Sequence, residues 1–318
     1  MASNQPNHQD RSPLHTEGGP AAETAPGAPA ATAAPAAWLR RRLADGELVV
    51  APGIFDGLSA HLVRRMGFLA GYLTGAGVAA AGFGLPDIGL VGMSEMVDRV
   101  SMVAGVLGDI PLIADADTGY GPPPSVARTV RAYERAGVAA IQLEDQAFPK
   151  RCGHLPGKEL VSVEEYLAKL GAALEAREDA LIIARTDARA VLGLDAAIER
   201  GNAYALAGAD IIFIEAPRTV EEITIIAREI AAPKLINVVA GGVTPDVDQA
   251  VLRELGYSIV IYPTTALLAV TNAAAAALRG IGGSDAVPPT SHMEDFFRLV
   301  GLDEWFAVSE RWPVDTRG

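Results

Sequence analysis

Sulfur and positive charge are both scarce in this sequence. Its 318 residues include one cysteine, Cys152, which excludes an intrachain disulfide and a cysteine-rich zinc or iron–sulfur site. Lys and Arg number 26 against 39 Asp and Glu, and the net charge of −13 argues against a nucleic-acid partner. No apolar stretch reaches the roughly 18 residues that span a bilayer, and the N-terminus has no apolar signal segment. We therefore expect a cytoplasmic protein without nucleic-acid or membrane partners.

Composition divides the chain into three parts. Residues 1–36 are rich in Ala, Pro, Thr and Gly, and we expect a disordered tail because little there can be buried. Over 37–280, short apolar runs alternate with helical segments about eight times, which is typical of a parallel α/β fold. This is the size of a (β/α)8 TIM-type barrel, with a doubly wound sheet as the runner-up. Residues 281–318 are predicted to form a C-terminal helical segment.

Polar side chains gather where the predicted strands end. These residues are Tyr72, Thr74, Asp115, Asp117, Glu144, Asp145, Arg185, Asp187, Glu215, Asn237 and Tyr262. The amino ends of the same strands carry small or apolar residues, apart from Lys234. Because a barrel places its active site at the carboxyl ends of its strands, this asymmetry predicts a polar site on one face.

Several of these residues are acids that would repel one another. The run Asp115-Ala-Asp117 places two carboxylates on the same side if the strand continues that far, with Glu144 and Asp87 nearby in the predicted barrel. A hard divalent cation resolves the repulsion, and we expect Mg²⁺, with Mn²⁺ as an alternative. The five histidines show no zinc-binding spacing. The other interpretation, that each acid caps a helix or pairs with an arginine, stays open for Asp145 and Asp187.

The run Pro149–His154 is a second candidate for chemistry. A single cysteine is more often buried and inert, but Lys150, Arg151 and His154 are unusual neighbours for a core residue. Adjacent cations lower the pKa of a thiol, so Cys152 is suited to exchange a proton near neutral pH. Gly153 adds the freedom that a loop closing over substrate needs.

The run Thr74-Gly75-Ala76-Gly77 is a weak match to a dinucleotide-binding turn, because Gly82 and Gly84 would interrupt the helix it requires. We favour a turn whose backbone N–H groups meet a substrate carboxylate. A Schiff-base aldolase is also disfavoured, since only four lysines are present and Lys234 lies at the wrong end of its strand.

Together these motifs resemble the isocitrate lyase/phosphoenolpyruvate mutase superfamily. The matching stretches are Tyr72–Gly77, Gly84–Asp87, Asp115–Gly119, Leu143–Gln146, Lys150–His154, Ala184–Asp187, Glu215–Pro217 and Asn237. The resemblance implies a (β/α)8 barrel, dependence on Mg²⁺, and a homotetramer whose subunits exchange a C-terminal helix. The mutases of this family carry Asn where this chain has Cys152, so the resemblance points to the carbon–carbon lyases.

The resemblance also implies a reaction. A 2-hydroxy dicarboxylate binds the metal, a base removes the hydroxyl proton, and the bond between C2 and C3 breaks to give a 2-oxo acid. Asp115 and Asp117 would hold the metal, with Asp87 and Glu144 acting directly or through water.

Further roles follow from the same resemblance. Tyr72 would be the base or the partner of the alkoxide, and Arg185 would stabilise the developing enolate. Cys152 would then protonate the carbanion, with Lys150, Arg151 and His154 tuning it. The residues expected to bind or orient the substrate are Thr74, Gly75, Ala76, Gly153, Glu215, Asn237 and Thr265.

One departure from the family pattern bears on the substrate. Methylisocitrate lyases carry an Arg a few residues after the equivalent of Tyr262-Pro263, and this chain has Leu268 there; the polar residues after the Asn are replaced by Val238–Gly242. A third carboxylate would be unpaired, so we expect an alkylmalate-type dicarboxylate over methylisocitrate. The alternatives are an oxaloacetate hydrolase or decarboxylase on the same barrel, or a non-catalytic barrel that binds a dicarboxylate.

Overall fold

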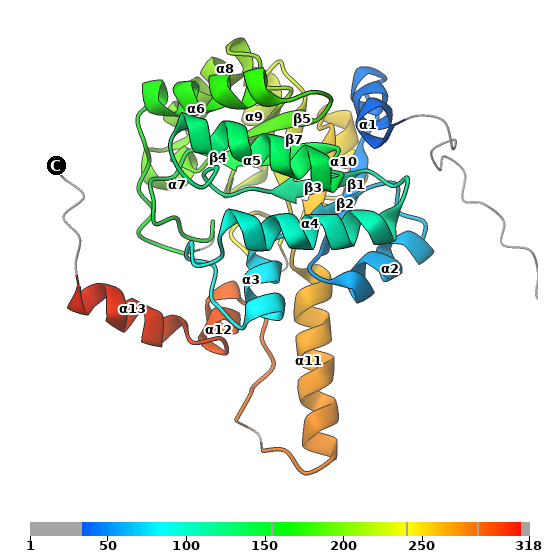
Figure 1. The fold of residues 1–318 in the computed structure, drawn as a ribbon, viewed down its shortest axis with the longest axis vertical. Helices are drawn as coiled ribbons and strands as arrows, with labels where there is room; N and C mark the ends of the chain where they lie inside the picture. Colours follow the sequence, from blue (N-terminus) through cyan, green and yellow to red (C-terminus); the bar gives the residue numbers. More distant parts are fainter. Residues whose placement is uncertain (1–33, 154, 240, 285, 313–318) are drawn as a thin grey trace, which may run out of the picture.

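Eight parallel strands close into a barrel in sequence order, and β1 is hydrogen-bonded to β8 (Figure 1). The computed structural model describes residues 34–312, apart from 154, 240 and 285. The strands are β1 (Val49–Ile54), β2 (Gly71–Leu73), β3 (Leu112–Asp115), β4 (Ala140–Glu144), β5 (Leu181–Thr186), β6 (Ile211–Ile214), β7 (Lys234–Asn237) and β8 (Ile259–Tyr262). The predicted TIM-type barrel is therefore confirmed, and the doubly wound sheet is not.

Helices surround the barrel. They are α1 (Pro35–Ala44), α2 (Gly57–Arg65), α3 (Gly75–Phe83), α4 (Met93–Leu107), α5 (Pro123–Ala136), α6 (Val163–Ala176), α7 (Ala188–Val191), α8 (Leu194–Leu206), α9 (Val220–Glu229), α10 (Gln249–Glu254), α11 (Thr265–Gly280), α12 (Met293–Arg298) and α13 (Leu302–Arg311). α5 shows why such segments are helical: Val126, Val130 and Tyr133 are buried at helical spacing, and Gly137 ends the helix at φ 102°.

The barrel interior is filled with apolar side chains and closed at its amino end. Ile113, Ile183 and Phe213 point into the same cluster as Trp38 and Leu39 of α1, which cover the bottom of the barrel. The sequence predicts a tail that ends at residue 36. Residues 1–33 lie outside the described residues, whereas Pro35 and Ala36 already belong to α1, and Ala36 is buried.

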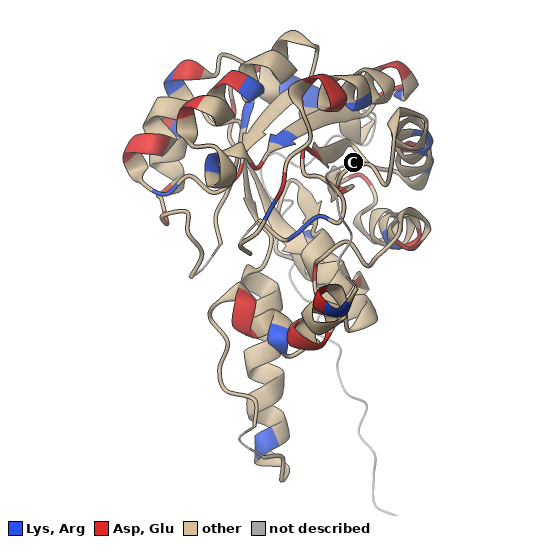
Figure 2. Ribbon diagram, turned by 90° about the vertical axis from the view of Figure 1, so that its left-hand side faces the viewer, with Lys and Arg blue, Asp and Glu red and all other residues tan. Residues whose placement is uncertain are grey.

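The C-terminal segment leaves the barrel and returns to its carboxyl end. α11 projects away from the barrel and carries charge only at Arg279, near its far end (Figures 1 and 2). Hydrogen bonds join Asn272 to Thr290, and α12 then packs with the Cys152 loop through Met293 and Phe297. No helix in the described part of the chain has the length and hydropathy of a bilayer-spanning segment.

Candidate active site

Residues from seven strand ends line one small cavity at the carboxyl end of the barrel. From the strands and the turns after them come Tyr72, Thr74, Ala76, Asp115, Glu144, Arg185, Glu215, Asn237, Val239, Ile261, Pro263 and Thr264. The loops add Asp87, Lys150, Arg151, Cys152 and Gly153, and α12 adds Met293. The structure therefore brings most of the predicted polar residues together at the carboxyl end of the barrel.

The cavity collects polar atoms that have no partner. Among the described residues, four buried side-chain nitrogen or oxygen atoms lack a hydrogen bond, and three of them line this cavity: Glu144 Oε1, Asn237 Oδ1 and Thr264 Oγ1. Buried polar groups are normally hydrogen-bonded, so atoms left without a partner in a cavity indicate a bound ligand, ion or water. The cavity measures about 40 Å³, enough for on the order of three water molecules. A larger substrate can enter only if part of the wall moves.

Acidic side chains cluster on one side of the cavity around Lys150. The Lys150 ammonium forms ion pairs with Asp87 and with Asp117, at 2.8 Å from Asp117 Oδ1. Burial raises the pKa of Asp117 to about 7 despite this partner, and burial also raises the pKa of Glu144. Burial alone would lower the pKa of Lys150, but Asp117, Asp87 and Glu144 raise it well above its ordinary value. The cluster therefore holds more negative charge than its one ammonium group balances.

Asp115 and Asp117 contact each other, but not as two residues on the same side of one strand, which was the prediction. β3 ends at Asp115, so the strand does not continue to Asp117. Asp117 instead has φ 47°, a conformation that Asp tolerates better than most residues, and its backbone N–H donates to Asp115 Oδ1 at 3.1 Å. Asp115 faces the cavity described here, whereas Asp117 lines a neighbouring cavity and reaches the cluster through Lys150.

The donor set of this cluster fits a hard divalent cation. Its ligands are carboxylate oxygens, which Mg²⁺ prefers, and the unpartnered Glu144 Oε1 offers a buried acceptor. In the part of the chain that the structure describes, however, no three acidic, His or Cys side chains converge as a ready-made metal site. Lys150 neutralises Asp87 and Asp117 instead.

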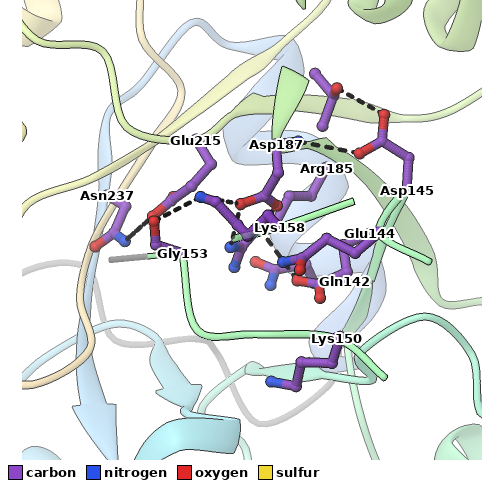
Figure 3. Close-up of polar contacts among 12 residues, drawn as sticks. Gln142, Glu144, Asp145, Lys150, Gly153, Lys158, Arg185, Asp187, Glu215 and Asn237 are labelled. Carbon is purple, nitrogen blue, oxygen red and sulfur yellow. Dashed lines mark hydrogen bonds and ion pairs between the residues drawn. The ribbon is translucent and has the colours of Figure 1, made fainter. Parts of the chain in front are cut away.

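Arg185, at the end of β5, lies in a buried ion-pair network (Figure 3). Its Nε is 2.9 Å from Asp187 Oδ2 and 3.3 Å from Glu144 Oε2. Burial opposes ionisation of Asp187, but Arg185 and Lys158 beside it hold its pKa well below the ordinary range. Asp145, in contrast, pairs with Arg200 at 2.9 Å. Asp145 and Asp187 therefore pair with arginines, which is the second interpretation that the sequence left open for these two acids.

Tyr72 lies deep in the barrel mouth. Its hydroxyl donates to Gln142 Oε1 at 3.2 Å, and Gln142 Nε2 donates to Asp115 Oδ1 at 3.3 Å. Burial, with Asp115 adding to it, raises the pKa of Tyr72 well above 10. Near neutral pH this residue is a phenol, so it is suited to donate a hydrogen bond and is a poor base.

The loop that carries Cys152 is fastened to the barrel at several points. Gln146 binds both the N–H and the carbonyl of Arg151, at 2.9 and 2.8 Å. The N–H of Cys152 donates to the Asp87 carbonyl at 3.0 Å. Gly153 lies so close to the site that a Cβ there would be 2.4 Å from Glu215 Oε1 and 2.7 Å from Arg185 Nη2. Any larger residue there would displace the loop or these two side chains. His154 lies outside the described residues.

Glu215 and Asn237, at the ends of the neighbouring strands β6 and β7, contact each other in the cavity wall. The Asn237 amide nitrogen is 3.3 Å from both Glu215 carboxylate oxygens, as Figure 3 shows. The other amide atom, Asn237 Oδ1, accepts no hydrogen bond from the described residues.

Three predicted positions differ from expectation. α3 continues through Gly82 and ends at Gly84 with φ 65°, so the predicted interruption of this helix at Gly82 is wrong. Gly75 does not line the cavity. It packs closely against Asp115, since a Cβ at position 75 would lie 2.7 Å from Asp115 Oδ2. Thr265 is exposed at the first turn of α11, and its neighbour Thr264 lines the cavity in its place.

Some residues of the site carried no sequence signal. Met293 comes from α12, far along the chain, and Ile261 and Pro263 are ordinary apolar residues of β8 and the turn after it. Lys158 was also missed, although its side chain is buried in the Asp187 network. A lysine six residues after Cys152 would have merited attention, since buried lysines need partners.

The comparison with protein families decides the identity. The phosphoenolpyruvate phosphomutase family model matches residues 39–282, which is the whole barrel. This chain belongs to the phosphoenolpyruvate mutase/isocitrate lyase superfamily. Among its relatives, the 2,3-dimethylmalate lyase of Eubacterium barkeri is 50% identical over 240 residues, covering 75% of this chain and 83% of that protein. The 2-methylisocitrate lyase of Aeropyrum pernix is 44% identical over 271 residues, covering 84% and 87%.

Solved structures of the superfamily agree with the barrel described here. A crystal structure of 2,3-dimethylmalate lyase has a TM-score of 0.75 at 38% identity, covering 88% of this chain and 96% of that one. An oxaloacetate acetylhydrolase in complex with 3,3-difluorooxaloacetate has a TM-score of 0.74 at 37% identity, covering 87% and 97%. A phosphonopyruvate hydrolase, with a TM-score of 0.69 at 33% identity and coverage of 88% and 99%, was solved with oxalate and Mg²⁺.

These findings confirm the expected superfamily, and with it a lyase enzyme. Members of the superfamily bind Mg²⁺ and small dicarboxylates.

Proposed function

We propose that this superfamily member is a Mg²⁺-dependent carbon–carbon lyase that cleaves a 2-hydroxy dicarboxylate with apolar substituents into a 2-oxo acid and a second carboxylic acid. The observation that carries the proposal is the mixed composition of the cavity wall. Acids and cations line the cavity, and Ala76, Val239, Ile261 and Met293 contribute apolar surface to it. Leu268 is buried in the same apolar cluster as Ala76, Val239 and Met293, and the family resemblance matches its position to the Arg of methylisocitrate lyases. An alkyl group is matched by such a wall, and a third carboxylate is not.

The acidic cluster is our candidate for the Mg²⁺ site. Asp115 and Glu144 would hold the ion, with Asp87 and Asp117 directly or through water, and Lys150 would give up its role as their counter-charge. When bound, Mg²⁺ supplies positive charge for the substrate's hydroxyl and carboxylate oxygens.

The residues of the chain divide the reaction among them. The hydroxyl proton on C2 would pass to one of the carboxylates that line the cavity and would return from it to the Cys152 thiolate after turnover. Tyr72, as a phenol, would donate a hydrogen bond to the same oxygen while that oxygen becomes a carbonyl. Arg185 would stabilise the negative charge that develops on the leaving half when the bond from C2 to C3 breaks. Cys152 would transfer its thiol proton to C3, and the resulting thiolate would lie beside the cations of its own loop.

Oxaloacetate hydrolysis is the second candidate, because the barrel of an oxaloacetate acetylhydrolase is nearly as similar to this one as that of 2,3-dimethylmalate lyase. The two activities differ in their products. The purified protein is therefore incubated with Mg²⁺ and 2,3-dimethylmalate, 2-methylisocitrate or oxaloacetate in parallel, and the 2-oxo acid or oxalate released is quantified. Pyruvate from dimethylmalate supports the proposal; oxalate from oxaloacetate alone favours the hydrolase, and no turnover of any substrate favours a binding protein.

We also propose a homotetramer in which α11 and the segment after it pack on a neighbouring subunit. α11 stands off its own barrel and leaves Val270 and Leu278 exposed, and α2 exposes Leu58 and Leu62 one turn apart (Figure 1). Exposed apolar patches on helices are typical of subunit interfaces. Light scattering on the eluting protein should give about four times the chain mass of 33.1 kDa. A monomer would contradict the proposal.

A further inference from the structure

Lys158 is a buried lysine for which the reaction above has no role. It is 8% exposed, and its ammonium group makes two contacts within the described residues. Nζ donates to the Gly153 carbonyl at 2.6 Å and lies 2.8 Å from Asp187 Oδ1 (Figure 3). Burying an ammonium group is costly unless it is paired and hydrogen-bonded, so both contacts matter to its position.

The two contacts join the loop to the strand that carries Arg185. Gly153 directly follows Cys152, so its carbonyl is part of the backbone that places the thiol. Asp187 follows β5 and also receives two hydrogen bonds from Arg185, at 2.9 and 3.2 Å. The Asp187 carboxylate therefore binds both Lys158, which contacts the loop, and Arg185, which lines the cavity.

Two cavities border the loop. The cavity of the candidate active site is about 40 Å³, too small for a substituted dicarboxylate. Lys158, Gly153 and Leu155 also border a second cavity of about 360 Å³ on the outer side, together with Val191 of α7. This space lies beside the part of the loop that follows Cys152. Before Cys152, the loop is fastened by the ion pairs of Lys150 with Asp87 and Asp117. After it, Lys158 supplies the charged contact, whereas the bonds to Gln146 and to the Asp87 carbonyl involve uncharged donors.

From these contacts we infer that Lys158 is a positioning residue that holds the Cys152 loop closed and, through Asp187, keeps Arg185 aligned. The inference rests on the proposed function in one respect: closure matters because Cys152 must reach the carbanion. Lys158 itself touches neither the cavity nor the substrate.

The position of the loop can be followed through the reactivity of Cys152, because it is the only cysteine in the chain. Alkylation of the protein by iodoacetamide, measured by mass, reports the accessibility of this thiol without any substrate. Lys158→Met removes both contacts. The matched control is Lys234→Met, since Lys234 is equally exposed at 8%, donates to the Ile230 carbonyl at 3.0 Å, and lies at the opposite end of the barrel.

We expect Lys158→Met to be alkylated at least about tenfold faster than the wild type, because a hydrogen bond from a charged group is lost. Its kcat should fall by about 100-fold, the scale for a misplaced reacting group, with KM changed much less. Lys234→Met should have the alkylation rate and the kcat of the wild type. If Lys158→Met does not fold, Lys158→Gln, which is too short to reach both acceptors, is held to the same criteria.

Alkylation of the folded Lys158 variant at the wild-type rate would overturn the inference, as would equal acceleration in the Lys234 variant. Because this measurement uses no substrate, it decides the role of Lys158 even where the assignment of the substrate fails.

Discussion

Cys152 is placed by its neighbours. Its own N–H donates to the Asp87 carbonyl, and Gly153 after it lies so close to Arg185 and Glu215 that a larger residue would displace them or the loop. The thiol is buried in the same apolar cluster as Met293 and Val239, so it faces the apolar part of the cavity wall. This is the position that a group needs if it is to protonate carbon.

The first expected outcome concerns this thiol. Cys152→Ser keeps the shape of the side chain but replaces the thiol with a much weaker acid, so turnover should fall by about 10² to 10⁴, the usual scale for one proton donor. The melting temperature is measured alongside, to show that the fold is intact. A rate near that of the wild type would limit Cys152 to packing.

The second concerns Gly153. Gly153→Ala places a methyl group 2.4 Å from Glu215 Oε1 and 2.7 Å from Arg185 Nη2, so either the loop or these two cavity-lining side chains must shift, and activity should drop by about 100-fold. Gly105→Ala is the control, because Gly105 lies in α4 with nothing within 4 Å of an added Cβ. That control should retain full activity and gain about 0.5–1 kcal/mol of stability. Equal activity of the two variants would show that the loop tolerates displacement.

At the scale of elements, the eight strands were predictable because each is a short apolar run buried on both faces, as in any parallel barrel. The polar residues that end them were predictable from the same reasoning. What was not predictable depends on tertiary contacts. Asp117 leaves the strand because its N–H binds Asp115, and Met293 enters the site because α12 packs on the Cys152 loop. Neither contact leaves a periodic signal in the sequence.

A third expected outcome tests the network that joins β5 to the loop. Arg185 and Lys158 hold the pKa of Asp187 below its unfolded value of about 3.9, so its ionisation stabilises the fold above that pH. This stability is lost as the pH falls from about 4 toward the lower folded pKa, by up to about 1.4 kcal/mol per pH unit. Urea unfolding of the wild type and Asp187→Asn should therefore show a constant difference from pH 7 to 5 that shrinks below pH 4. A difference that is independent of pH would contradict the assigned ionisation.

At the scale of the whole molecule, the acidic character of the chain, with a net charge of −13, includes a buried cluster of acids at the barrel mouth. Four carboxylates surround one lysine at the barrel mouth, and burial raises the pKa values of two of them. A divalent cation would relieve that repulsion.

The fourth expected outcome follows from this charge balance. Exhaustive chelation should abolish turnover, and Mg²⁺ or Mn²⁺ should restore it. The melting temperature of the folded protein should also rise with Mg²⁺ concentration, since binding to the folded state alone adds stability. Asp115→Asn should lose this rise. Full activity in a thoroughly chelated sample would exclude a metal requirement.

The central claim is that the site accepts a dicarboxylate with apolar substituents. A third carboxylate placed against Val239, which packs in the same apolar cluster as Leu268, would lose its hydration without an ionic partner there, at a cost of several kcal/mol. The most direct test compares kcat/KM for 2,3-dimethylmalate and 2-methylisocitrate on the same preparation with saturating Mg²⁺. The account predicts that dimethylmalate is favoured by at least about tenfold, equivalent to about 1.4 kcal/mol. A tenfold preference for methylisocitrate would contradict it.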